Sequence, residues 1–141
     1  MSSTILTIAD AVVASLNGAS FSMPFTSQRR LVPTFDLPDL VALQVSVVPR
    51  SSARTASGRR DSWLDCTIDV GVQKQVVGDA DADALIALTE EIAEHLSHQR
   101  LAGAPEAAWL ATATDPLIAA EHLDQQRAFT SVVSVTYRVR T

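Results

Sequence analysis

The sequence predicts an α+β fold, in which an antiparallel or mixed β-sheet of about four strands carries two helices packed on one face. Two segments place apolar residues every three or four positions, as on one helix face, and others alternate apolar and polar residues as strands do. The expected order is a helix, three strands, a helix, an irregular stretch and a final strand. Strands that cluster in this way favour an α+β layer.

Length and composition predict a single domain over residues 1–141. Hydrophobic residues make up 47% of the chain and charged residues 19%, which is enough apolar material for one core. The apolar runs are far shorter than the roughly 20 residues of a spanning helix, so we expect no membrane segment. Polar residues interrupt the early apolar positions, and we therefore expect no ordinary signal peptide.

The first predicted helix begins after a cap at Ser3 or Thr4 and ends at Asn17 and Gly18, a pair that predicts a left-handed stop. Its apolar residues share one face: Ile5, Ile8, Val12 and Leu16.

Three strands are predicted next. Residues 28–35 form an edge strand, where the missing amide donor of Pro33 does no harm, and a turn follows at Asp36, Pro38 and Asp39. Residues 41–47 alternate and end at Pro49. Residues 64–72 alternate again, and the two alternating strands together predict a long hairpin. Their inward positions in the later strand are Leu64, Cys66, Ile68, Val70 and Val72.

An exposed, flexible, basic loop is predicted between these strands, at about residues 50–61. From Arg50 to Arg60 it contains no acid and no apolar residue larger than Ala. Its arginines are the candidate partner-binding residues: Arg50, Arg54, Arg59 and Arg60. Three interpretations stay open, namely a merely solvated loop, a salt-sensitive contact with an acidic protein, and nonspecific contact with DNA inside a ring. We expect no sequence-specific nucleic-acid binding, because the chain has a net charge of −5 and the loop lacks stacking aromatic residues.

Charge is unevenly distributed along the chain. Residues 1–60 hold three acids and six arginines, whereas residues 69–126 hold eleven acids against Lys74 and Arg100. If folding keeps these charges apart, one face of a subunit would attract the opposite face of the next.

The second predicted helix begins after Gly78, and Arg100 and Gly103 mark its end. Three acids in its first turns suit a helix N-terminus: Asp79, Asp81 and Asp83. Its inner face consists of Leu85, Leu88, Ile92 and Leu96.

The last part of the chain is less regular until residue 129. Ala107–Thr112 predicts a short strand that carries Trp109, and Pro116 opens a short helix through Leu123. Residues 129–139 alternate and are rich in β-branched residues, which predicts a long final strand.

Candidate catalytic groups do not form a convincing set. Cys66 with His95 as base is one possibility, but alternation turns Cys66 inward, where a buried thiol is typical. Asp65 and Asp69 share a strand face and could bind a metal, although a solvated sheet surface is the commoner arrangement. His95 and His98 lack the i, i+4 spacing that places two imidazoles on one metal. We therefore predict no catalytic residue, no metal, no cofactor and no enzyme activity.

Five segments are similar to those of a known family in their order and general residue pattern: ILTIADAVVASLNG, RRLVPTFDLPDL, CTIDVGVQK, DALIALTEEIAEHL and EHLDQQRAFTSVVSVTYRV. They resemble the phage tail-terminator family, typified by the lambda minor tail protein U, and especially its prophage-encoded branch. The resemblance covers essentially the whole chain and contains no catalytic motif.

The resemblance implies a structural subunit that forms a hexameric ring on the tail tube, stops tube growth and joins the head. The implied partners are other copies of the chain, the tail-tube protein and the head-completion protein. The chain would be monomeric or weakly associated alone. It would occupy the bacterial host cytoplasm during assembly and then the virion tail. Two alternatives remain: a head–tail completion or connector protein, and a small ligand-binding or hydrolytic domain using Asp65, Asp69 or His95.

Overall fold

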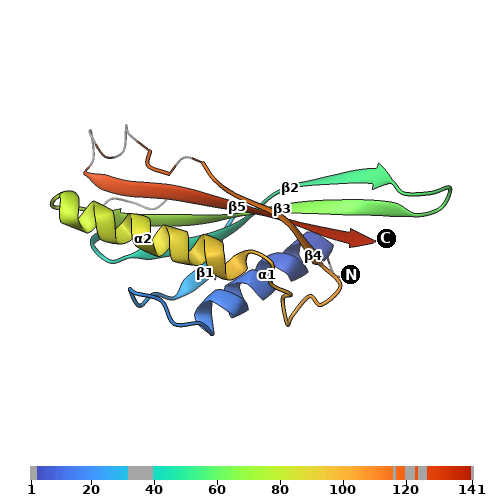
Figure 1. The fold of residues 1–141 in the computed structure, drawn as a ribbon, viewed down its shortest axis with the longest axis horizontal. Helices are drawn as coiled ribbons and strands as arrows, with labels where there is room; N and C mark the ends of the chain where they lie inside the picture. Colours follow the sequence, from blue (N-terminus) through green and yellow to red (C-terminus); the bar gives the residue numbers. More distant parts are fainter. Residues whose placement is uncertain (1–2, 32–39, 116, 120–122, 124–126, 141) are drawn as a thin grey trace.

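The computed structural model describes residues 3–31, 40–115, 117–119, 123 and 127–140. Within these residues the elements follow one another as α1 Thr4–Asn17, β1 Ser27–Arg29, β2 Gln44–Ala56, β3 Ser62–Gln75, α2 Asp79–Leu96, β4 Ala108–Thr114 and β5 Ala128–Arg140. The strands form one sheet in the order β1-β2-β3-β5-β4 (Figure 1). β1 pairs with β2 in parallel and the other pairs are antiparallel, so the sheet is mixed. The α+β prediction is confirmed, with five strands among the described residues where about four were expected.

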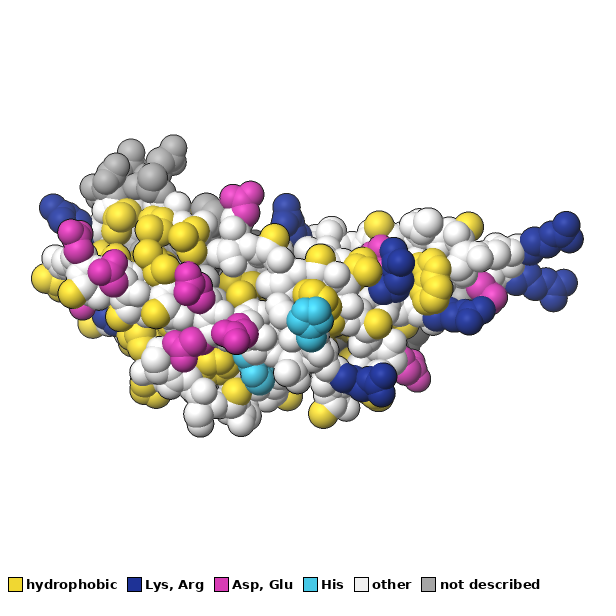
Figure 2. Space-filling model, in the orientation of Figure 1, with side chains coloured by type: hydrophobic (Ala, Val, Ile, Leu, Met, Phe, Trp, Pro, Cys, Tyr) yellow, Lys and Arg dark blue, Asp and Glu magenta, His cyan; other side chains and the backbone are white. Residues whose placement is uncertain are grey.

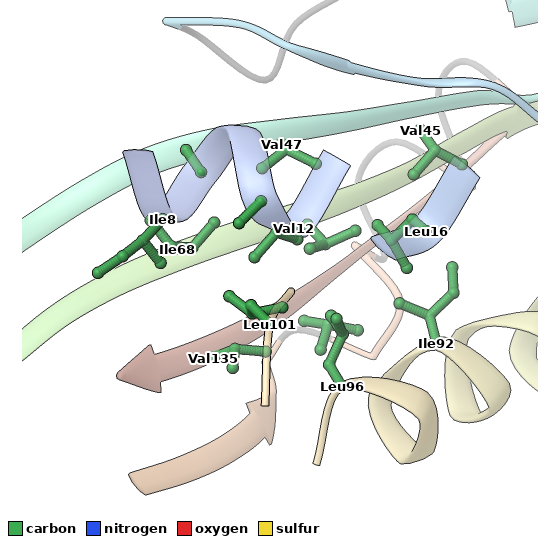
Figure 3. Packing of buried hydrophobic residues seen from close by; sticks show 14 of the residues in the cluster. Ile8, Val12, Leu16, Val45, Val47, Ile68, Ile92, Leu96, Leu101 and Val135 are labelled. Carbon is green, nitrogen blue, oxygen red and sulfur yellow. The ribbon is translucent and has the colours of Figure 1, made fainter. Parts of the chain in front are cut away.

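Both helices cover the same face of the sheet, as the sequence predicted (Figure 1). α1 packs chiefly against β1 and β2, and α2 packs against β5 and β4. Figure 3 shows side chains from both helices meeting those of the sheet in one cluster. The residues labelled there are Ile8, Val12, Leu16, Val45, Val47, Ile68, Ile92, Leu96, Leu101 and Val135.

α1 begins and ends at the predicted positions, but its C-terminus has a different geometry. Ser3 caps the helix, its hydroxyl accepting from the Leu6 amide at 3.5 Å. The left-handed stop was wrong, because Gly18 has a φ of −86°. The Asn17 side chain instead makes two hydrogen bonds with the first residue of β1. Ser27 N donates to Asn17 Oδ1 at 2.7 Å, and Asn17 Nδ2 donates to Ser27 O at 3.2 Å.

The first strand lies at an edge of the sheet, as predicted, and β1 covers Ser27–Arg29. The rest of the predicted strand and the following turn, including Pro33 and Asp36, lie outside the described residues.

β2 is longer than the sequence indicated. It was expected to end at Pro49, yet it continues to Ala56. The register with β3 shifts between Pro49 and Ser51, which leaves Arg50 as a bulge before pairing resumes. The β1 ladder reaches only to Val47, so within the described residues no β1 carbonyl requires an amide from Pro49. The basic segment is therefore mainly a paired strand, and the predicted loop shrinks to the turn at residues 57–61.

β3 and β5 match their predictions closely. The inward β3 positions that the alternation indicated are all buried, and β5 pairs with β3 along its whole length. The predicted strand carrying Trp109 is also confirmed as β4, which pairs with β5. The helix expected from Pro116 to Leu123 lies largely outside the described residues.

α2 buries the four predicted inner residues but ends earlier than expected. Ser97 is extended, with φ −74° and ψ 138°, and His98 has a φ of 59°. The Ser97 hydroxyl donates to Ala93 O at 2.7 Å and lies 2.9 Å from Thr112 Oγ1. The helix therefore ends at Leu96, where Ser97 leaves the helical conformation and contacts β4, and the boundary predicted at Arg100 was wrong.

Candidate functional site

The four predicted partner-binding arginines lie along one β-hairpin but do not form one patch. Arg50 sits at the bulge, on the sheet face opposite the helices, where its Nη1 lies 3.7 Å from Asp69 Oδ1. Arg54 is opposite the buried Leu64, so it lies on the helix side of the sheet. Arg59 and Arg60 occupy the turn. Figure 2 shows dark blue side chains at the far tip of the hairpin.

This hairpin presents its end to solvent. Every residue from Arg50 to Asp61 is exposed, although Ser51 to Ala56 pair with β3. The turn is closed by a hydrogen bond from Ser57 N to Asp61 O at 3.0 Å. We call Arg54, Arg59 and Arg60 the basic tip.

Polar side chains along the outer half of the hairpin, next to its turn, link β3 to β5. Arg138 donates two hydrogen bonds to Asp65, from Nε to Oδ1 at 2.8 Å and from Nη2 to Oδ2 at 3.0 Å. Arg140 bonds Asp61 at 3.0 Å. The Cζ atoms of both arginines lie 5.6 Å and 5.9 Å from the centre of the Trp63 ring, within cation–π range. These contacts would hold the direction of the hairpin relative to the sheet.

This cluster was not predicted from the sequence. Alternation correctly placed Trp63, Asp65 and Arg138 on the outer faces of their strands, but it gave no register. Only the pairing of Asp65 with Arg138 brings the two charges together. The hydrogen bond from Arg138 lowers the pKa of Asp65, against the opposing effect of burial.

The carboxylates considered as metal ligands are both engaged by neighbouring side chains. Asp65 is held by Arg138, and Asp69 Oδ1 accepts from Ser134 Oγ at 2.6 Å. A hydrogen bond between the Thr67 and Thr136 hydroxyls, 3.2 Å long, lies between them. Within the described parts of the chain, no group of three or more His, Cys, Asp or Glu residues could hold a metal ion.

Cys66 and His95 have separate structural surroundings. Cys66 is fully buried, and burial, followed by the nearby Asp65 charge, raises the pKa of its thiol. A raised pKa disfavours the nucleophilic thiolate. His95 lies against α1, where its Nε2 is 2.9 Å from Ser15 Oγ, and it meets the edge of Phe21 at 5.4 Å between ring centres. These contacts indicate packing roles.

α2 carries six acids and no Lys or Arg between Asp79 and Leu96. Two of them have local partners: Glu91 accepts from the Ser22 amide at 3.0 Å, and Asp81 accepts from the Val77 amide at 3.1 Å. The other four are exposed and fall within about 60° of one another around the helix axis, given 3.6 residues per turn. We call these four the acidic stripe: Asp79, Asp83, Glu90 and Glu94. Figure 2 shows acidic side chains gathered over α2.

No helix in the described ranges combines the length and the apolar character needed to cross a membrane.

Comparisons with known proteins found likeness in the solved structures but not in sequence families. No protein-family model matches the chain, and no curated protein matches its sequence. A chain from the virion of a native gene transfer agent particle aligns with a TM-score of 0.47 and 15% identity, covering 92% of this chain and 82% of that one. A chain from the PVC sheath/tube terminator of an extracellular contractile injection system, in its extended state, aligns with a TM-score of 0.50 and 18% identity.

The second alignment covers all of this chain but only 58% of the terminator chain. At 18% identity the likeness concerns the fold alone. The expectation of a terminator-like fold is thereby supported, whereas the comparisons provide no link to the lambda minor tail protein U.

Proposed function

We propose that the chain is a structural subunit of a phage-like tail: a tail terminator that caps the tail tube and offers a joining surface to the head. The observation that carries this proposal is the basic hairpin, which projects from a fold similar to that of a sheath/tube terminator. From Arg50 onward β2 buries no side chain in its own chain. Such a strand adds little to a hydrophobic core and is suited to contact with a partner.

The hairpin is also held in place for such a contact. Backbone pairing with β3 keeps it extended, and the Asp65–Arg138 pair ties β3 to β5 beside it. A surface that is held in one direction loses less conformational entropy when it binds than a mobile loop would.

The proposal assigns binding and no catalysis to the chain. Among the groups considered as reactive, Asp65 and Asp69 are bonded to neighbours and Cys66 is buried with a raised thiol pKa. The proposed partners are other copies of the chain in a hexameric ring, the tail-tube protein and the head-completion protein. Assembly would take place in the host cytoplasm, and the product would remain in the particle tail. One domain over residues 1–141 would suffice, without metal or cofactor.

Tube assembly in vitro tests this function. The tail-tube protein of the same genetic element is polymerised with and without this chain, and tubes are measured by negative-stain electron microscopy. We expect the chain at tube ends and shorter, more uniform tubes. Replacing Arg59→Ser and Arg60→Ser should reduce both effects, whereas Arg100→Ser, an exposed arginine beyond α2, should not.

The terminator role would be refuted if tube length did not change when the chain is added and no chain were found at the tube ends. Binding to the head-completion protein without binding to tubes would instead indicate a connector.

A further inference from the structure

We propose that the basic tip of one copy binds the acidic stripe on α2 of a second copy. The inference deepens the proposed function, on which it rests for its biological role, by naming the two surfaces through which neighbouring copies meet.

The two surfaces carry opposite charges, and at the tip the inference depends on Arg59 and Arg60. Among the described residues, neither Arg59 nor Arg60 belongs to any of the salt bridges, and the same is true of the four stripe acids. All of these side chains are exposed. Complementary potentials of this kind steer association and fix its direction.

The positions of the two surfaces exclude contact within one copy. Figure 2 shows the acidic side chains over α2 toward one end of the long axis and the arginines of the hairpin tip at the other. A tip can therefore reach a stripe only on another molecule. Such a contact joins two different patches, so it is heterologous, and it produces a ring when the rotation closes.

The shapes of the surfaces also match. The stripe spans the 16 residues from Asp79 to Glu94, or about 22 Å at a rise of 1.5 Å per residue. The exposed half of β2, Arg50–Ala56, extends over about 20 Å at 3.3 Å per residue. Side chains beside the stripe are small and exposed: Ala80, Ala84 and Ala87. The hairpin likewise carries mainly Ser, Ala, Thr and Gly between its arginines, so the two backbones can approach closely.

An acidic protein face suits the basic tip better than a nucleic acid does. Among the described residues of the hairpin, the one aromatic side chain is Trp63, which is already covered by Arg138 and Arg140 and is half-buried. The chain as a whole is negative, which weakens long-range attraction to DNA. Each copy also supplies one acidic stripe for each basic tip.

Site-directed cross-linking tests the contact. Gly58→Cys places a thiol at the tip, where an added Cβ meets no atom within 4 Å, and Ala87→Cys places one beside the stripe. The natural Cys66 is buried and does not compete. We expect a short bis-maleimide to join the two variants at low salt, with a yield that falls as salt rises. Ala102→Cys, exposed and away from the stripe, replaces Ala87→Cys as the control.

Charge reversal makes the test specific. Arg59→Glu with Arg60→Glu on the tip partner, or Asp83→Lys with Glu90→Lys on the stripe partner, should each lower the yield about tenfold or more. Combining the reversed tip with the reversed stripe should restore it. Arg100→Glu should leave it unchanged, and thermal unfolding checks that every variant is folded.

A yield no higher than that of the Ala102→Cys control would overturn the inference. The inference would also be overturned if the reversed tip lowered the yield but the reversed stripe left it unchanged. The tip would then bind elsewhere, for example on DNA or on another acidic protein. Tube assembly separates this failure from failure of the proposed function. If the chain limits tube length but no cross-link forms, only the tip-to-stripe contact is rejected. If the cross-link forms but the chain has no effect on tubes, only the terminator role is rejected.

Discussion

The two halves of β2 form the same kind of backbone ladder with β3 but differ in burial. Val45 and Val47 are 2% and 0% exposed beneath α1, whereas every residue from Arg50 to Ala56 is exposed. The bulge at Arg50 marks the change. Backbone pairing therefore makes a segment a strand, while burial decides whether that strand contributes to stability or supplies a surface. We call the two regions the body and the arm.

The largest expected effect belongs to the body, at its border with the arm. Ile68 is fully buried and stands opposite Pro49, just before the bulge. Ile68→Ala should lower the free energy of unfolding by about 2–5 kcal/mol, because it removes buried methyl groups and leaves a cavity. Urea unfolding measures this loss. Thr55→Ala in the arm should change the same quantity by no more than about 0.5 kcal/mol. Equal losses at the two sites would remove the distinction between body and arm.

The next effect is a loss of stability at high pH that comes from Tyr137, the one tyrosine in the sequence. Tyr137 is fully buried, and burial raises the pKa of its phenol well above the ordinary value near 10. The unfolded chain therefore loses this proton first, and the free energy of unfolding should fall above about pH 10 by roughly 1.4 kcal/mol per pH unit. Tyr137→Phe should remove this contribution to the slope, and phenolate absorbance should appear only on unfolding.

Tyr137→Phe should also leave stability at neutral pH unchanged or raise it by about 1 kcal/mol. Among the described residues the Tyr137 hydroxyl has no hydrogen-bond partner, and burying such a group is unfavourable. A loss of more than about 1 kcal/mol, beyond what a well-packed hydroxyl exchange produces, would show that the hydroxyl makes a stabilising contact in the body.

A smaller effect is expected at the Asp65–Arg138 pair, which lies beside the arm. Arg138 lowers the pKa of Asp65, so the unfolded chain takes up this proton first as pH falls. The stability from this carboxylate is present above about pH 4 and is lost as pH falls through the lower folded-state pKa. Asp65→Asn should be less stable than the parent at pH 7, and the difference should shrink toward pH 2. A difference that stays constant with pH would mean that packing, and not charge, is what Asp65 contributes where β3 meets β5.

The smallest effect on stability belongs to the arm. Replacing Arg54, Arg59 and Arg60 by Ser should change the free energy of unfolding by no more than about 0.5 kcal/mol, because no core contact is lost. Binding to tubes should nevertheless weaken and lose its salt dependence. Loss of cooperative unfolding in calorimetry would show that the arm is packed against the body.

The sequence by itself determined which side chains of each element face inward. Leu85, Leu88, Ile92 and Leu96 are buried in α2, as are the alternating residues of β3, because the 3.6-residue and 2-residue periods are fixed by local backbone geometry. It also indicated correctly that the polar groups of β3 lie on an uncovered sheet face.

Only the tertiary structure decided what the basic segment is and which charges meet. Arg50–Ala56 buries neither face, so it shows no alternation, and its strand form comes from hydrogen bonds to a partner elsewhere in the chain. Tertiary structure likewise brings together Asp65 and Arg138, which are 73 residues apart, and forms the hydrogen bonds between Asn17 and Ser27. Local spacing shows which way a side chain points, but register between distant segments decides what it touches.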